Sequence, residues 1–125
     1  MAAPYTSEFP ALFTIDGSNR HDIILINPGR SIKDLTSTIE KYATESPNCA
    51  EFMSKYKKKG ETLRVTEVMV KWATEGRDKQ LFPRQTLLTE DNCEAVLRMM
   101  QVGVGKDVID VKVEKTGGEA EKDHI

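Results

Sequence analysis

A two-layer α+β fold is the class that this sequence predicts, mainly from the order of its apolar patterns. Short apolar runs between turn residues predict strands, whereas capped segments with apolar residues at helical spacing predict helices. Along the chain these patterns give two strands, a helix, an added helix, two strands, a third helix and a last strand. Five strands with the helices on one face make a two-layer domain, and 125 residues suffice for one such core but not for two.

The first third of the chain predicts a hairpin followed by a helix. Residues 12–16 and residues 22–27 are the expected strands, with a Gly-Ser-Asn turn between them. Ser31 is a good N-cap, and Asp34 stands where a near capping box places an acidic residue. The helix is expected to run to about Thr44, with one apolar stripe made of Ile32, Leu35, Ile39, Tyr42 and Ala43.

An added helix is expected after the first one, because Ser46 followed by Pro47 is a typical helix start. It would cover residues 47–59 and would carry the one basic cluster of the sequence at its end. Such a cluster is a candidate nucleic-acid contact, but lysines also suit the negative end of a helix dipole, and we favour a solvated helix end. The candidate contact residues are Lys55, Lys57, Lys58, Lys59 and Arg64.

The second half predicts two strands, a helix and a last strand. Residues 63–73 are rich in valine, and their alternation slips near Thr66, which indicates a bulge or a bend. Residues 81–88 are expected to return as the next strand, and Thr89 to cap a helix that a pair of glycines ends. Residues 108–114 form the expected last strand, in which one face is shared by Ile109, Val111 and Val113.

These elements define one domain from residue 9 to residue 115. Residues 1–8 are small and polar, and residues 116–125 are mostly charged or small, so both ends are expected to be flexible. Hydrophobic residues make up 38% of the chain and charged residues 30%, which is typical of a globular domain. A net charge of −2 gives no overall attraction to nucleic acid or to anionic lipid.

The expected location is cytoplasmic or nuclear. No apolar run is long enough to cross a membrane, and the start of the chain lacks a basic stretch followed by an apolar one. Two cysteines do not make a disulfide framework, so free thiols are expected.

Catalytic and metal-binding patterns are sparse. His21 and His124 have no Cys or His partner at metal-ligand spacing. Cys49 and Cys93 fall on apolar helical faces, where cysteine behaves as a small hydrophobic residue. The run Gly103-Val104-Gly105-Lys106 follows a helix and precedes a strand, the reverse of a phosphate-binding loop. We therefore expect no enzymatic activity, no metal and no cofactor.

The most informative segment is Asp-Val-Ile-Asp-Val-Lys-Val-Glu-Lys-Thr-Gly-Gly, residues 107–118. It resembles the end of small ubiquitin-like modifiers of the SUMO family, in which a terminal strand runs into Thr-Gly-Gly and a short tail is removed. The order of elements is likewise similar to the ubiquitin β-grasp fold. The resemblance implies that Gly118 carries the carboxylate joined to a target amine, while Gly117 gives clearance in narrow enzyme clefts.

The same resemblance implies a groove between the second strand and the main helix, which accepts an extended hydrophobic peptide as an added strand. By similarity it would use Ile24, Ile26, Leu35 and Ile39. The family's basic helical position near this groove is matched here by Asp34, which would repel acidic flanks. The added helix over residues 47–59 has no counterpart in the family.

The predicted function is that of a non-enzymatic, ubiquitin-like protein that acts through protein–protein contacts and, by resemblance, is conjugated through Gly118. One alternative is an unprocessed assembly or scaffold subunit with an exposed edge at residues 81–88. A second alternative is a nucleic-acid-binding module that uses the lysine cluster. The partner and the oligomeric state are left open.

Overall fold

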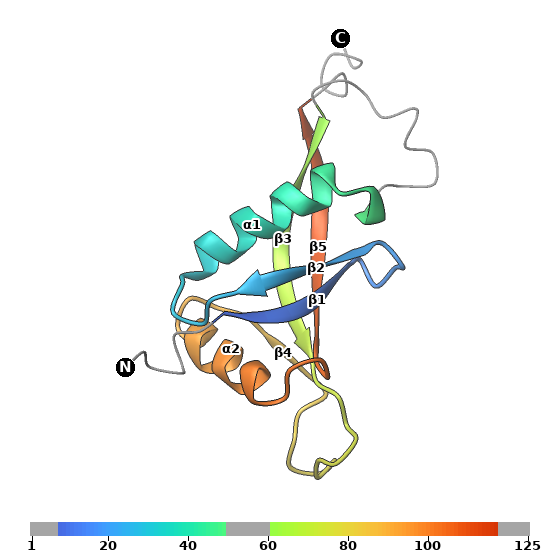
Figure 1. The fold of residues 1–125 in the computed structure, drawn as a ribbon. Helices are drawn as coiled ribbons and strands as arrows, with labels where there is room; N and C mark the ends of the chain where they lie inside the picture. The colour runs from blue at the N-terminus through green and yellow to red at the C-terminus, as the bar shows by residue number, and fades with distance from the viewer. Residues whose placement is uncertain (1–7, 50–60, 118–125) are drawn as a thin grey trace.

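The computed structural model describes residues 8–49 and residues 61–117, and they form an α+β fold as the sequence predicts. Figure 1 shows a single mixed sheet of five strands, with its helices packed against it. In chain order the elements are β1 (Phe9–Ile15), β2 (His21–Ile26), α1 (Ile32–Glu45), the 3-10 turn η2 (Pro47–Cys49), β3 (Glu61–Lys71), β4 (Gln85–Leu87), α2 (Cys93–Val102) and β5 (Val108–Gly117).

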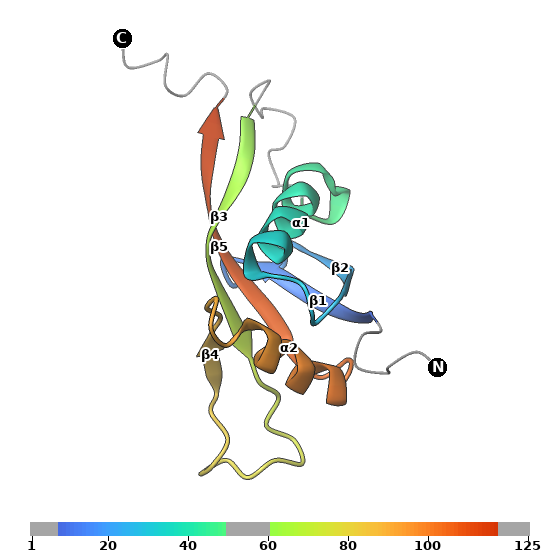
Figure 2. The same ribbon diagram turned by 90° about the vertical axis from the view of Figure 1, so that its left-hand side faces the viewer.

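The strand order across the sheet is β2-β1-β5-β3-β4, which places β5, the last strand of the chain, at the centre. β1 and β5 are parallel, from Leu12 opposite Val108 to Ile15 opposite Val111. β3 is antiparallel to β5 along its whole length, whereas β1 leaves β5 after Val111. The far halves of β3 and β5 therefore continue as a two-stranded ribbon, which points away from α2 and β4 (Figures 1 and 2).

A β-bulge interrupts β3 where the sequence predicts a slip. Val65 lies opposite Val113 and Glu67 opposite Lys112, so Thr66 is the extra residue. Its hydroxyl donates a hydrogen bond to the backbone carbonyl of Lys112 at 3.2 Å. The bulge keeps both Val65 and Val68 against the core, although three positions separate them along the strand.

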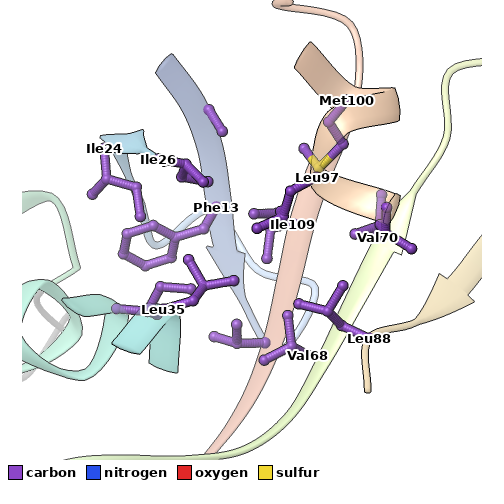
Figure 3. Close-up of a cluster of buried hydrophobic side chains, with 14 of the residues drawn as sticks. Phe13, Ile24, Ile26, Leu35, Val68, Val70, Leu88, Leu97, Met100 and Ile109 are labelled. Atoms are coloured by element: carbon purple, nitrogen blue, oxygen red, sulfur yellow. The ribbon is translucent and has the colours of Figure 1, made fainter. Parts of the chain in front are cut away.

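Both helices cover the same face of the sheet, and each buries a row of apolar residues there. Tyr42, which the sequence places in the apolar stripe of α1, is 39% exposed. α1 contributes the predicted inward residues Leu35, Ile39 and Ala43, and Ser31 caps it by accepting a hydrogen bond from the backbone N–H of Asp34. Figure 3 shows Phe13 facing Leu35 and the β2 isoleucines, while Leu97 of α2 lies beside Ile109 of β5. The resulting core joins β1, β2, β3 and β5 to both helices, and Leu88 adds to it just after β4.

Several predicted boundaries are wrong. β1 begins at Phe9, because Phe9 and Ala11 continue the buried alternation. β4 is confined to Gln85–Leu87, since the chain turns at residues 81–82, whose backbone N–H groups donate to the carbonyl of Asp78. α2 begins at Cys93, because Thr89 and Asn92 exchange two hydrogen bonds in a turn that precedes the helix.

Two further expectations concern the ends of predicted elements. At the predicted start of the added helix the structure has the 3-10 turn η2 (Pro47–Cys49), and residues 50–59 of the prediction lie outside the described residues. The last strand extends beyond the predicted residue 114 and pairs with β3 as far as Gly117, opposite Glu61.

Asp110 anchors the middle of β5 to the turn between β1 and β2. It is only 9% exposed. One of its carboxylate oxygens accepts hydrogen bonds from the hydroxyl of Thr14 at 2.5 Å and from the backbone N–H of Gly17 at 2.8 Å. Gly17 has a φ of +68°, a conformation that glycine adopts without steric cost, so the turn can present its N–H to the strand.

Asp107 anchors the start of β5 to the loop between β3 and β4. Its buried carboxylate accepts hydrogen bonds from the backbone N–H of Ala73 at 2.8 Å and from both terminal nitrogens of Arg77, at 2.6 and 3.2 Å. The Arg77 guanidinium also lies 4.6 Å from the ring centroid of Phe82 and 5.8 Å from that of Trp72. The hydrogen bond to Asp107 raises the pKa of Arg77 above its ordinary value.

Replacing Asp107 with alanine is expected to lower the free energy of unfolding by about 3 kcal/mol, because Arg77 and the Ala73 N–H would lose a buried acceptor. Urea unfolding followed by circular dichroism measures this. The matched control is Glu94→Ala, which breaks an exposed ion pair to Arg98 within α2 and should cost less than about 1 kcal/mol. Equal losses in the two variants would contradict the anchoring role.

Candidate interaction surface

β2 is an edge strand, with β1 as its one neighbour in the sheet formed by the described residues. The hydrogen bond from the Ile15 N–H to the Arg20 carbonyl, at 3.0 Å, sets the phase of the antiparallel ladder. Because hydrogen-bonded pairs alternate along such a ladder, the backbone groups of Ile24 and Ile26 point toward β1. Those of Ile23 and Leu25 point outward, to the open edge, where another strand could add.

The first half of this edge is occupied by groups of the same chain. The carbonyl of His21 accepts a hydrogen bond from the Cys49 thiol at 3.3 Å, and the N–H of Ile23 donates to the Asp22 carboxylate at 2.8 Å. A hydrogen bond from the Ser46 side chain lowers the pKa of Asp22, and contacts with Ile23, Asn48 and His21 act in the same direction. η2 thus closes the start of the edge and leaves the part around Leu25 open.

The open part of the edge has an apolar surface on its outer side and a hollow on its inner side. Ile23 and Leu25 are 61% and 62% exposed, and Leu12 continues the outer row from Ile23 to Val108 on β5. The inner hollow lies between β2 and α1 and has a volume of about 220 Å³. Its lining residues are Glu8, Leu25, Ile26, Asn27, Arg30, Asp34, Leu35 and Thr38.

The four residues that the resemblance assigns to a peptide groove are almost completely buried, although residues that line a groove would be accessible to a peptide. Ile24, Ile26, Leu35 and Ile39 are 4%, 3%, 5% and 0% exposed. Ile26 and Leu35 reach the lining of the hollow, whereas Ile24 and Ile39 belong to the core. Ile24 and Ile39 thus do not line this hollow, and the peptide groove itself stays a prediction.

The accessible apolar residues of β2 are instead Ile23 and Leu25, which sequence reasoning missed. The run from Ile23 to Ile26 contains four aliphatic residues in succession, so it has no polar position that marks the solvent side. The phase of the strand is set by its pairing with β1, because side chains opposite one another in a sheet share a face. In β1, from Phe9 to Ile15, every second side chain is buried, and this alternation determines which side chains of β2 face the core.

The C-terminal ribbon is the second feature that sequence reasoning singled out. Gly117 pairs with Glu61 at the end of the β3–β5 ladder, and Gly118 lies outside the described residues. Arg64 is exposed on this ribbon and lies opposite Glu114, so an acidic neighbour offsets its charge. The four lysines of the predicted basic cluster also lie outside the described residues, so a nucleic-acid contact that joins them to Arg64 stays a prediction.

The cysteines, the histidines and the Gly103–Lys106 run are the other residues that the sequence analysis considered for chemistry. Cys49 and Cys93 are buried, as predicted, and burial raises the pKa of both thiols, which disfavours the reactive thiolate. His21 contacts the Asn19 carbonyl through Nδ1 at 2.7 Å, and His124 lies outside the described residues. The Gly103–Lys106 run forms the turn that ends α2, with Gly105 at a φ of +87°.

No metal-binding group of three or more His, Cys, Asp or Glu side chains is present within residues 8–49 and 61–117. None of the helices in this part of the chain is long and apolar enough to cross a membrane.

Comparisons with protein-family models, curated proteins and solved structures each found no match to the chain. Function therefore has to be inferred from the strand order, the open edge of β2 and the charges around it.

Replacing Asp22 with asparagine is expected to reduce the dependence of stability on pH in the acid range. The lowered pKa means that the charged Asp22 stabilises the fold above its unfolded pKa of about 3.9, and that this contribution is lost as the pH falls through the lower folded value. Urea unfolding at a series of pH values should show a difference between the parent and Asp22→Asn that shrinks below about pH 4.

Ser46→Ala serves as the matched control for this prediction, because it removes the hydrogen-bond partner and retains the carboxylate. It should reproduce much of the loss, and the double variant should lose little more than Asp22→Asn alone. A stability difference that stays constant from neutral to acid pH would contradict the role of the charged carboxylate.

Proposed function

We propose that this chain is a ubiquitin-like β-grasp protein that acts by binding other proteins, without catalysis of its own. The observation that carries the proposal is the strand order β2-β1-β5-β3-β4, with β1 and β5 parallel in the middle and α1 across one face. This arrangement is similar to the β-grasp, and it agrees with the resemblance of residues 107–118 to the end of SUMO-family modifiers.

The proposed binding mode is strand addition at the Leu25 end of β2. An extended segment of the partner would bond the outward N–H and carbonyl of Leu25. The side chains of the partner segment alternate between the two faces of the sheet. Every second one would therefore enter the hollow between β2 and α1, and the others would contact Ile23 and Leu25. The partner segment should therefore be apolar on both sides.

Charges around the hollow select the flanks of that segment. Glu8 and Asp34 line it together with Arg30, so two carboxylates face one guanidinium. Acidic residues next to the apolar run would be repelled by Asp34 and Glu8, whereas basic residues would be attracted. The proposed partner is thus a protein with an extended apolar segment and basic flanks.

A displayed library of random peptides tests the binding mode. The folded chain should select peptides with an apolar run of four or more residues. Leu25→Pro should weaken their binding by at least tenfold, since proline removes the outward N–H at a position that donates no bond to β1. The matched control Leu25→Thr keeps the N–H and should weaken binding less. Selection of no apolar peptides, or equal effects of the two variants, would contradict strand addition.

Conjugation through Gly118 is the more specific part of the proposal. The β3–β5 ribbon supports it, because β5 runs directly to Thr116 and Gly117, the two residues that precede Gly118 in the sequence. Removal of residues 119–125 would leave Gly118 as the carboxyl end. Glycine is suited to this position, because it lacks a side chain that would block a narrow enzyme cleft.

Mass spectrometry of the tagged chain from its native cells tests conjugation. The expected species end at Gly118 or are linked through it to a lysine of another protein. Gly118→Val should abolish the linked species, whereas the matched control Ala120→Val, in the segment to be removed, should leave them unchanged. Chains that all retain residues 119–125, with no linked species, would exclude the modifier and leave an unprocessed interaction module.

A further inference from the structure

α2 exposes an apolar stripe on the face that points away from the core. Its inward face is formed by buried residues Cys93, Val96, Leu97 and Met100. On the opposite side, Ala95, Met99 and Val102 follow one another at helical spacing. Met99 is 47% exposed and Val102 90%, so the stripe is accessible from solvent.

Charges of opposite sign flank the two ends of the stripe. Glu90 and Asp91 are exposed in the turn before α2, and Glu94 is exposed in its first turn. Lys106 is exposed in the turn that follows the helix, and Arg98 in the second half of α2 forms an ion pair with Glu94. The start of α2 is therefore acidic, and the turn after the helix carries one exposed cation, Lys106.

We propose that α2 is an interface through which two copies of this chain form a weak antiparallel dimer. A twofold axis that passes the helix between Arg98 and Met99 places Ala95 of one copy opposite Val102 of the other, a small side chain against a larger one. The same axis brings the acidic turn before α2, with Asp91, to the end of the second copy whose following turn carries Lys106. The apolar stripe and the charged ends of α2 in one copy thus match the same stripe and the opposite charged ends in the second copy.

The charges at the two ends of α2 favour the antiparallel orientation over the parallel one. A parallel pair of α2 helices would bring Asp91 against Asp91 and Lys106 against Lys106, which costs energy. An antiparallel pair satisfies both charges twice, once on each side of the axis. Because the stripe is short, the buried area lies at the low end of protein interfaces, and the dimer is expected to form only at high protein concentration.

The position of α2 keeps the proposed dimer compatible with conjugation. α2 lies near one end of the long β3–β5 pair, and the ribbon that ends at Gly117 projects from the other end (Figures 1 and 2). Two copies joined through α2 would therefore have their C-terminal ribbons pointing away from the interface. This inference does not depend on the proposed function, since it rests on α2 and its flanking turns alone.

Sedimentation velocity of the purified full chain over about a hundredfold range of concentration tests the dimer. Val102→Glu and Met99→Glu should each raise the dissociation constant by at least about tenfold, because each places a charge in the apolar stripe. Leu81→Glu is the matched control: Leu81 is 83% exposed in the loop before β4, and its replacement should leave the constant unchanged. Circular dichroism checks that every variant is folded.

A charge-swap cycle tests the antiparallel orientation. Asp91→Lys alone and Lys106→Asp alone should each raise the dissociation constant by about fivefold, and the double variant should restore it. A sedimentation coefficient that stays monomeric at every concentration would overturn the proposal. A dimer that Val102→Glu does not weaken, or one that the double swap does not restore, would also overturn it, because the copies would then be joined elsewhere.

Discussion

The pairing of β5 with β1 on one side and β3 on the other is the constraint on which the rest of the fold depends. β5 is the last strand of the chain, yet it lies at the centre of the sheet, so the sheet is completed only when this strand arrives. Two buried carboxylates hold it there. Asp107 fixes the start of β5 to the β3–β4 loop. Asp110 fixes the strand to Thr14 at the end of β1, 96 positions away in the sequence, and to Gly17 in the β1–β2 turn. Pairing over such distances makes folding slow relative to local structure.

The same constraint determines which surfaces are left for partners. Because β5 occupies the centre, β2 becomes an edge strand, and its pairing phase with β1 turns Ile23 and Leu25 outward. Because β1 leaves β5 after Val111, the rest of β5 has β3 as its partner and continues as a ribbon to Gly117. An open edge and a projecting C-terminal strand are thus consequences of one topology, and together they support a protein that works by being bound.

Local signals in the sequence predicted the local structure well. Ser31 and the apolar spacing after it placed α1 correctly, and the slip near Thr66 marked the bulge, because caps and alternation depend on neighbouring residues. Features that depend on distant partners could not be predicted in this way. The sequence did not reveal the exposed side of β2, because its phase comes from β1, nor the bond between Arg77 and Asp107, which joins two segments 30 positions apart.

Amide hydrogen exchange measured by NMR tests the central claim most directly, since it reports both the position of β5 and the state of the β2 edge. The backbone N–H groups of Ile109 and Val111 should be among the slowest to exchange, because a central strand opens only when the whole sheet unfolds. In β2, Leu25 should exchange much faster than Ile24 and Ile26, whose N–H groups point toward β1. Rapid exchange along β5, or protection of Leu25 equal to that of its neighbours, would contradict the account.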